Sequence, residues 1–122
     1  MKNDSLNWYV VAILYESVHE GEPKNVDEDY DTTTNVYEER HILVKATSTE
    51  EAELLGEKIG KEYEDPYENQ YGEKVIWKLV KILQSFELLD EQLNTGTEVY
   101  SRYILTEKEL STQDVLKRYF NE

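Results

Sequence analysis

Histidine and arginine side chains within strand-like segments are the first candidates for chemistry in this chain. His41 lies in such a segment near Glu39 and Tyr37. A catalytic histidine needs a nucleophile or an orienting acid within hydrogen-bond reach. The sequence contains no motif that indicates an activated nucleophile. We therefore expect no catalytic residue, and we take His41 as a candidate binding residue.

Arg102 stands in the strand-like stretch that also contains Tyr100. An arginine in the middle of a strand must reach solvent, pair with an acid or bind a ligand. We favour a structural ion pair, with Glu16, Glu38 or Glu39, over an anion site. If the sheet has an open face that holds a ligand, we expect Trp8, Tyr100 and Arg102 to line it.

A run of acids follows the first strand-like segment, with six Asp and Glu between Glu20 and Asp31. Asp27, Glu28, Asp29 and Asp31 resemble a calcium-binding loop in their spacing, but the run lacks the central glycine and the closing glutamate. We interpret these four residues as an acidic surface that faces a protein partner, and we expect no metal site and no cofactor.

The charge of the whole chain is its strongest compositional signal. It has 122 residues, with 27 Asp and Glu against 13 Lys and Arg, a formal net charge of −14. Such a charge repels nucleic acid and anionic membranes and attracts basic partners. The apolar run from Trp8 to Tyr15 is too short to span a membrane, and there is no cysteine for a disulfide. We expect a cytoplasmic protein with one domain over residues 1–122.

The elements that position these residues can be predicted from local pattern. Residues 7–16 and 36–47 favour strands, with an acidic hairpin loop over 19–35 between them. Ser48 and Glu51 form a capping box that opens a helix, which should end before Pro66. Gly56 and Gly60 lie on the apolar stripe of this helix, which indicates close approach to a sheet.

The second half of the chain predicts two further strands and a helix. Residues 73–89 favour a strand with a bend or bulge near Gln84 and Ser85, although residues 76–83 also match helical spacing. A fourth strand is predicted over 97–106 and a capped helix over 111–120. The order β-β-α-β-β-α predicts an α+β fold, a curved antiparallel sheet of about four strands with a helix packed on one face.

Several stretches resemble a known family. The N-terminal WYVVAILY, the helix start with spaced glycines, VIWKLVKILQSFEL and above all GTEVYSR are similar to the bacterial domain of unknown function 4288. The resemblance runs from about Trp8 to Thr106, within a family-like core of residues 7–106. It implies a compact α+β domain and transfers no catalytic residue, because the family has no assigned activity.

Three functions remain open at this point. The first is a non-catalytic acidic protein, of immunity type or inhibitory, that binds a basic protein partner. The second is a small-ligand-binding module or subunit that uses the open sheet face, and the third is a carboxylate-based enzyme, which we rank last. We also expect a homodimer, because the first strand is apolar on both faces and would be covered by a helix and by a partner subunit.

Overall fold

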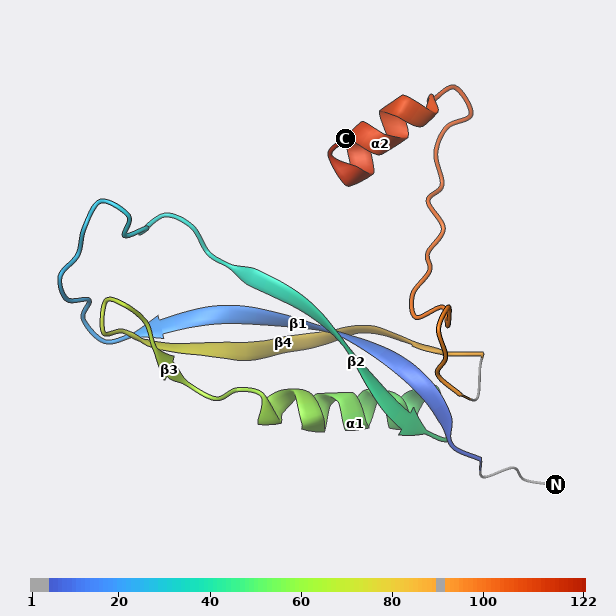
Figure 1. The fold of residues 1–122 in the computed structure, drawn as a ribbon, viewed down its shortest axis with the longest axis horizontal. Helices are drawn as coiled ribbons and strands as arrows, with labels where there is room; N and C mark the ends of the chain where they lie inside the picture. The colour runs from blue at the N-terminus through green and yellow to red at the C-terminus, as the bar shows by residue number, and fades with distance from the viewer. Residues whose placement is uncertain (1–4, 90–91) are drawn as a thin grey trace.

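The computed structural model describes residues 5–89 and 92–122. In the described part, the elements follow the order β1 (Asn7–Glu20), β2 (Tyr37–Ala46), α1 (Thr49–Glu62), β3 (Tyr67–Glu68), β4 (Lys74–Glu87) and α2 (Thr112–Phe120). The strands form one antiparallel sheet in the spatial order β2-β1-β4-β3. The sheet is twisted and α1 covers one of its faces (Figure 1). The predicted α+β class is confirmed.

The core lies between β1 and α1. Alternate side chains of β1 point towards the helix and are almost completely buried, namely Tyr9, Val11, Ile13 and Tyr15. Val44 and Ala46 from the end of β2 and Ala52 from α1 complete this cluster. Period-two alternation of apolar residues therefore sets the face that β1 and β2 turn to the helix.

Helix α1 approaches the sheet through its two glycines, as predicted. A Cβ atom added to Gly56 would lie 2.6 Å from Cγ1 of Val11. One added to Gly60 would lie 2.8 Å from Cδ1 of Leu79. The hydroxyl of Tyr15 donates a buried hydrogen bond of 2.7 Å to the carbonyl oxygen of Gly60. Side chains at these two positions would hold the helix away from β1.

The predicted capping box of α1 is only half formed. Oγ of Ser48 accepts a hydrogen bond of 3.1 Å from the amide of Glu51. The Glu51 carboxylate, however, accepts from the amide of Thr47 at 2.7 Å rather than from Ser48. The helix ends at Glu62, before Pro66 as expected, with Tyr63 as its C-cap.

Strand β4 confirms the strand prediction and rules out the helical alternative for residues 76–83. Its register with β1 shifts twice, between Ala12 and Ile13 and between Leu14 and Tyr15. The shifts leave Leu83 and Val80 as the extra residues on β4, so one bulge lies next to the predicted position at Gln84.

The prediction of a strand over residues 97–106 is wrong. This segment has no ladder partner, and the fourth strand is instead the two-residue β3, which pairs with Val75 and Lys74. The ring of Tyr100 in this segment contacts the sheet, and the chain then runs away from the sheet to α2 (Figure 1). The predicted C-terminal helix forms as α2 and has a complete capping box between Ser111 and Asp114.

Candidate functional site

The face of the sheet opposite α1, here called the open face, is partly covered by the C-terminal part of the same chain. The Tyr100 ring lies 5.3 Å from the His41 ring of β2 and 5.7 Å from the Phe86 ring of β4, between centroids. Because β1 lies between these strands, Tyr100 spans β1 over Val10 and Ala12. Both are buried, although their side chains point away from the helix.

This arrangement shows what covers the second face of β1, the strand that is apolar on both faces. We predicted that a partner subunit would cover its second face, whereas residues 97–101, here called the crossing segment, cover it at Val10 and Ala12. Val99 of the crossing segment also lines a small cavity of about 220 Å³ with Val10, His41, Ile42 and Leu43.

His41 is positioned by Glu39, two residues away on the same face of β2. Its Nε2 lies 2.6 Å from Oε2 of Glu39. An imidazole held by a carboxylate is the orienting half of an acid–base site. Here both side chains remain substantially exposed on a strand surface, which suits binding through hydrogen bonds and ring stacking.

The four predicted binding residues do not form one cluster. His41 and Tyr100 meet on the open face, but the Arg102 guanidinium lies 5.8 Å from the Phe120 ring of α2. Trp8 lies near the start of β1, where the ammonium of Lys45 stands 5.0 Å from its ring.

The ion pair predicted between Arg102 and Glu16, Glu38 or Glu39 does not form. The three acids considered for it have other partners: Glu16 accepts from the Tyr37 hydroxyl, Glu38 pairs with Arg40, and Glu39 contacts His41. The prediction failed because it assumed a strand over 97–106 that would have brought Arg102 beside β1 and β2.

The acidic loop between β1 and β2 is fastened to the turn between β3 and β4. The hydroxyl of Tyr71 donates to Oδ1 of Asp27 at 2.8 Å, and that of Tyr30 donates to Oε2 of Glu73 at 2.9 Å. The rings of Tyr30 and Tyr71 meet edge to face with centroids 4.8 Å apart. These hydrogen bonds to carboxylates raise the pKa of both tyrosines above 10.0.

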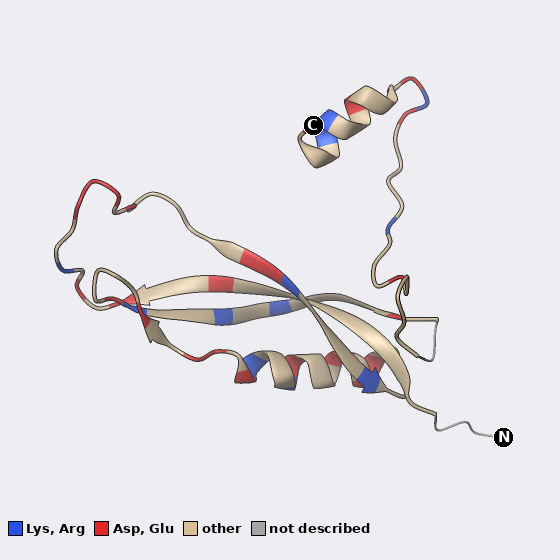
Figure 2. Ribbon diagram, in the orientation of Figure 1, with Lys and Arg blue, Asp and Glu red and all other residues tan. Residues whose placement is uncertain are grey.

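Within the loop, short-range hydrogen bonds order two of the predicted partner-facing acids. Oδ1 of Asp27 also accepts from the amide of Asp29 at 3.0 Å. Asp31 accepts from the amide of Thr33 at 2.7 Å and from Thr34 at 3.2 Å. The bonds from Thr33 and Thr34 lower the pKa of Asp31 to about 2. All four predicted acids are exposed, and Figure 2 shows the acidic stretch at the loop.

Glu73 is the residue that sequence reasoning missed. It is 6% exposed and accepts from Nδ2 of Asn69 at 3.1 Å as well as from Tyr30. The bond from Asn69, followed by that from Tyr30, lowers the pKa of Glu73. The only sequence signal near Glu73 is the turn-forming pair Asn69 and Gly72 just before it. This signal predicts a turn and does not predict that the Glu73 carboxylate is buried.

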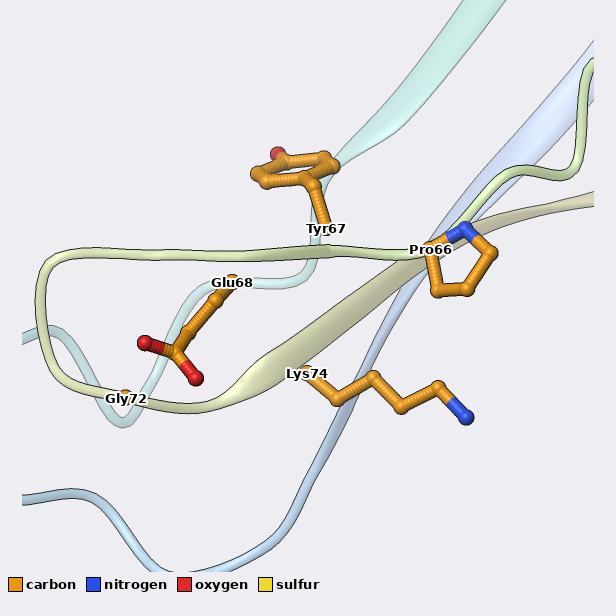
Figure 3. Close-up of a pocket in the computed structure, with 5 residues that line it drawn as sticks. All are labelled: Pro66, Tyr67, Glu68, Gly72 and Lys74. Atoms are coloured by element: carbon orange, nitrogen blue, oxygen red, sulfur yellow. The ribbon is translucent and has the colours of Figure 1, made fainter.

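Two further cavities open on the surface of the described residues. One of about 350 Å³ lies beside the β3–β4 turn and is lined by Pro66, Tyr67, Glu68, Gly72 and Lys74 (Figure 3). The other, of about 500 Å³, lies between the end of β4 and the crossing segment, with Glu87, Glu98 and Ser101 among its lining residues. Neither of them contains any of the four predicted binding residues.

The described residues bring no three His, Asp or Glu side chains together in a group that could hold a metal ion. No helix in the described part of the chain is long and apolar enough to cross a membrane.

A comparison with protein-family models matches residues 8–101 to a domain of unknown function, DUF4288. The resemblance inferred from the sequence is thereby confirmed, and the match ends at Ser101 rather than at Thr106. No curated protein matches the chain, and no solved structure matches it.

Proposed function

Because the chain belongs to the DUF4288 family, whose function is unknown, we propose a function from its surface. The protein is a non-catalytic acidic interaction protein of the cytoplasm. It binds a basic protein partner, as an immunity-type or inhibitory protein does. One observation carries the proposal: the net charge of −14 lies entirely within residues 1–101, since residues 102–122 hold four bases and four acids.

The acidic loop is the part of this surface best suited to recognition. Tyr30 and Tyr71 tie it to the β3–β4 turn, while Glu22, Glu28 and Asp29 stay exposed. A loop that is already ordered loses less conformational entropy on binding. Its exposed carboxylates would steer a basic surface to one place and pair with it there.

The charge also argues against nucleic acid as the partner. Proteins bind nucleic acid by neutralising phosphates with Lys and Arg, and 13 such residues here face 27 acids. A basic protein, including one that itself binds nucleic acid, has the complementary charge.

Capture from a lysate of the native host tests the proposal, with the purified chain as bait at low and moderate salt. We expect one basic protein in stoichiometric amount, lost as salt rises. A bait with Glu22→Gln, Glu28→Gln and Asp29→Asn should bind that protein at least about tenfold more weakly, since it loses three charges at the contact.

The matched control removes three charges elsewhere. Glu50→Gln, Glu57→Gln and Glu62→Gln change three exposed acids of α1, and this bait should keep most of its affinity. Equal losses for both baits would mean that only overall charge matters. Recovery of no basic protein by the unmodified chain would refute the proposal.

A second candidate is a small-ligand-binding module, favoured by the cavity beside His41 and Tyr100. Its volume of about 220 Å³ lies below the roughly 300–1,000 Å³ of most ligand sites, which is why we rank it second. A metabolite that raises the melting temperature of the chain, but not that of a His41→Ala variant, would reverse this order.

We also propose that the chain self-associates as a homodimer. The support is its aromatic content, with ten Tyr and two Trp, and the number of large apolar side chains that stay exposed on the described residues.

A further inference from the structure

We infer that residues 102–120, here called the hook, dock on the open face of a second copy of this chain, which places its own hook in return. The inference rests on the homodimer proposed above and is independent of the basic partner.

The hook exposes apolar side chains that have no cover. Tyr103 is 95% exposed and Leu105 is 89% exposed. Helix α2 carries Val115, Leu116, Tyr119 and Phe120, yet none of its residues is buried. A nine-residue helix is marginal by itself in water and gains its stability from packing. Large exposed apolar side chains gathered on one segment are characteristic of an interaction site.

The hook is also a structural unit of its own. The Arg102 guanidinium lies 5.8 Å from the Phe120 ring, and Arg118 pairs with Glu107 at 3.7 Å. Helix α2 therefore folds back along the extended residues 102–110 that lead to it. The unit begins directly after Ser101, where the family match ends. Figure 1 shows it standing clear of the sheet.

The crossing segment shows that side chains from the C-terminal part of the chain pack on the open face of the sheet. Tyr100 lies on the open face between His41 and Phe86. Beside it, Leu43 remains 42% exposed, and Leu14 on the same face is only half-buried. Partly exposed apolar side chains of the open face thus remain on either side of Tyr100, at Leu43 and at Leu14, and a second aromatic segment extends the packing that Tyr100 begins.

The sequence of residues 97–110 disfavours a tight turn that would fold the hook back onto the sheet of its own chain. Of the residues that tight reversals use, Gly, Pro, Asn and Asp are absent between Thr97 and Leu110, and Ser occurs once, at Ser101. Val99, Tyr100, Tyr103 and Ile104 instead favour extended backbone. The first turn, with the amide of Leu110 donating to Glu107, comes only before α2.

Charge favours the hook as the contact between copies. Two bodies of residues 1–101, each with a net charge of −14, repel one another. The hook of one copy brings no net negative charge, and it presents Arg102, Lys117 and Arg118 to an acidic body. A twofold exchange of hooks satisfies both copies by the same contact.

The test uses the full chain in two measurements. Sedimentation equilibrium across micromolar concentrations should give a dimer, and Tyr103→Asp with Leu105→Asp should raise the dissociation constant about thirtyfold or more, as loss of a hot spot does. Both side chains are exposed in the single copy, so the variant keeps the fold. Leu54→Asp, at a 70% exposed position of α1, is the matched control and should dimerise normally.

The second measurement locates the contact. The chain has no cysteine, so Thr106→Cys, at an exposed position of the hook that leaves Tyr103 and Leu105 in place, carries a single spin label. Labelled chains are mixed with ¹⁵N-labelled, spin-free chains, and amide signals of Leu14, His41 and Leu43 should broaden. Broadening elsewhere, or dimers unaffected by the aspartates, overturns the hook exchange and leaves the homodimer standing. A monomer mass throughout overturns both.

Discussion

At the residue scale, the two glycines of α1 decide how closely the helix lies on the sheet. A helix gains about 1 kcal/mol when an internal glycine becomes alanine. At Gly56 that gain is opposed, because the new Cβ would stand 2.6 Å from a Val11 methyl group in the centre of the core. Val11 is fully buried and cannot move aside without disturbing its neighbours.

Gly56→Ala should therefore destabilise the protein. Overpacking typically costs about 1–3 kcal/mol, and after the helix-propensity gain we expect a net loss of about 1–2 kcal/mol in the free energy of unfolding by urea denaturation. Glu57→Ala, the next residue on the exposed side of α1, is the control and should be close to neutral. A more stable Gly56→Ala protein would show that the helix can move away from β1 at little cost.

The Asp31 carboxylate gives a prediction about pH. Its pKa is about 2 in the folded chain, against 3.8 in the absence of the Thr33 and Thr34 hydrogen bonds. The folded pKa is the lower one, so the carboxylate stabilises the fold above about pH 4, and this contribution is lost as pH falls towards 2.

Carboxyl ¹³C titration should give this value for Asp31 directly. The difference in stability between the parent and an Asp31→Asn variant should also shrink between about pH 4 and pH 2. A midpoint at the ordinary aspartate value would mean that Thr33 and Thr34 do not hold the carboxylate in solution.

At the element scale, the acidic loop and the β3–β4 turn form one unit held by two tyrosine–carboxylate bonds. In each bond the hydroxyl donates to a carboxylate, Tyr71 to Asp27 and Tyr30 to Glu73. The pKa of each tyrosine is raised, so on the alkaline side this contribution is complete up to about pH 10 and is lost as pH rises through the raised values.

Tyr71→Phe should loosen the loop while the sheet stays intact. The ring remains, so packing is preserved, while the hydrogen bond from the hydroxyl to Asp27 is lost. Hydrogen–deuterium exchange should rise over residues 21–35 and stay unchanged over β1. Tyr37→Phe, which removes an exposed bond to Glu16, is the matched control. Unchanged exchange in the loop would show that Tyr30 and Glu73 suffice to hold it.

The elements also show what could be predicted from the sequence. Helix α1 and strands β1, β2 and β4 were found because capping residues and apolar periodicity are local signals. Residues 97–106 have the same local strand signal. A strand also requires a sheet edge to pair with, and whether this segment meets one depends on the path of the chain after β4. The pairing of His41 with Tyr100 could not be predicted for the same reason, since it depends on the crossing segment rather than on a register.

At the scale of the whole molecule, the net charge of −14 opposes folding. Folding of the described residues into one sheet and helix brings their excess acids within the range of mutual repulsion. That range is about 30 Å at 0.01 M salt and about 8 Å at 0.15 M. The stability of this fold should therefore increase with ionic strength.

Sodium chloride should raise the melting temperature by several degrees between 10 and 300 mM, at a concentration where the chain is monomeric. Two variants separate repulsion from a general salt effect, because α1 carries exposed acids at both ends. Glu62→Gln removes a negative charge from the negative end of the helix dipole and should stabilise by about 0.3–1 kcal/mol at low salt. Glu50→Gln removes the same charge from the positive end, where the favourable dipole term offsets the relief of repulsion, so its gain should be smaller or reversed. Both effects should fade at 300 mM, and a melting temperature insensitive to salt would mean that the acids lie too far apart to repel.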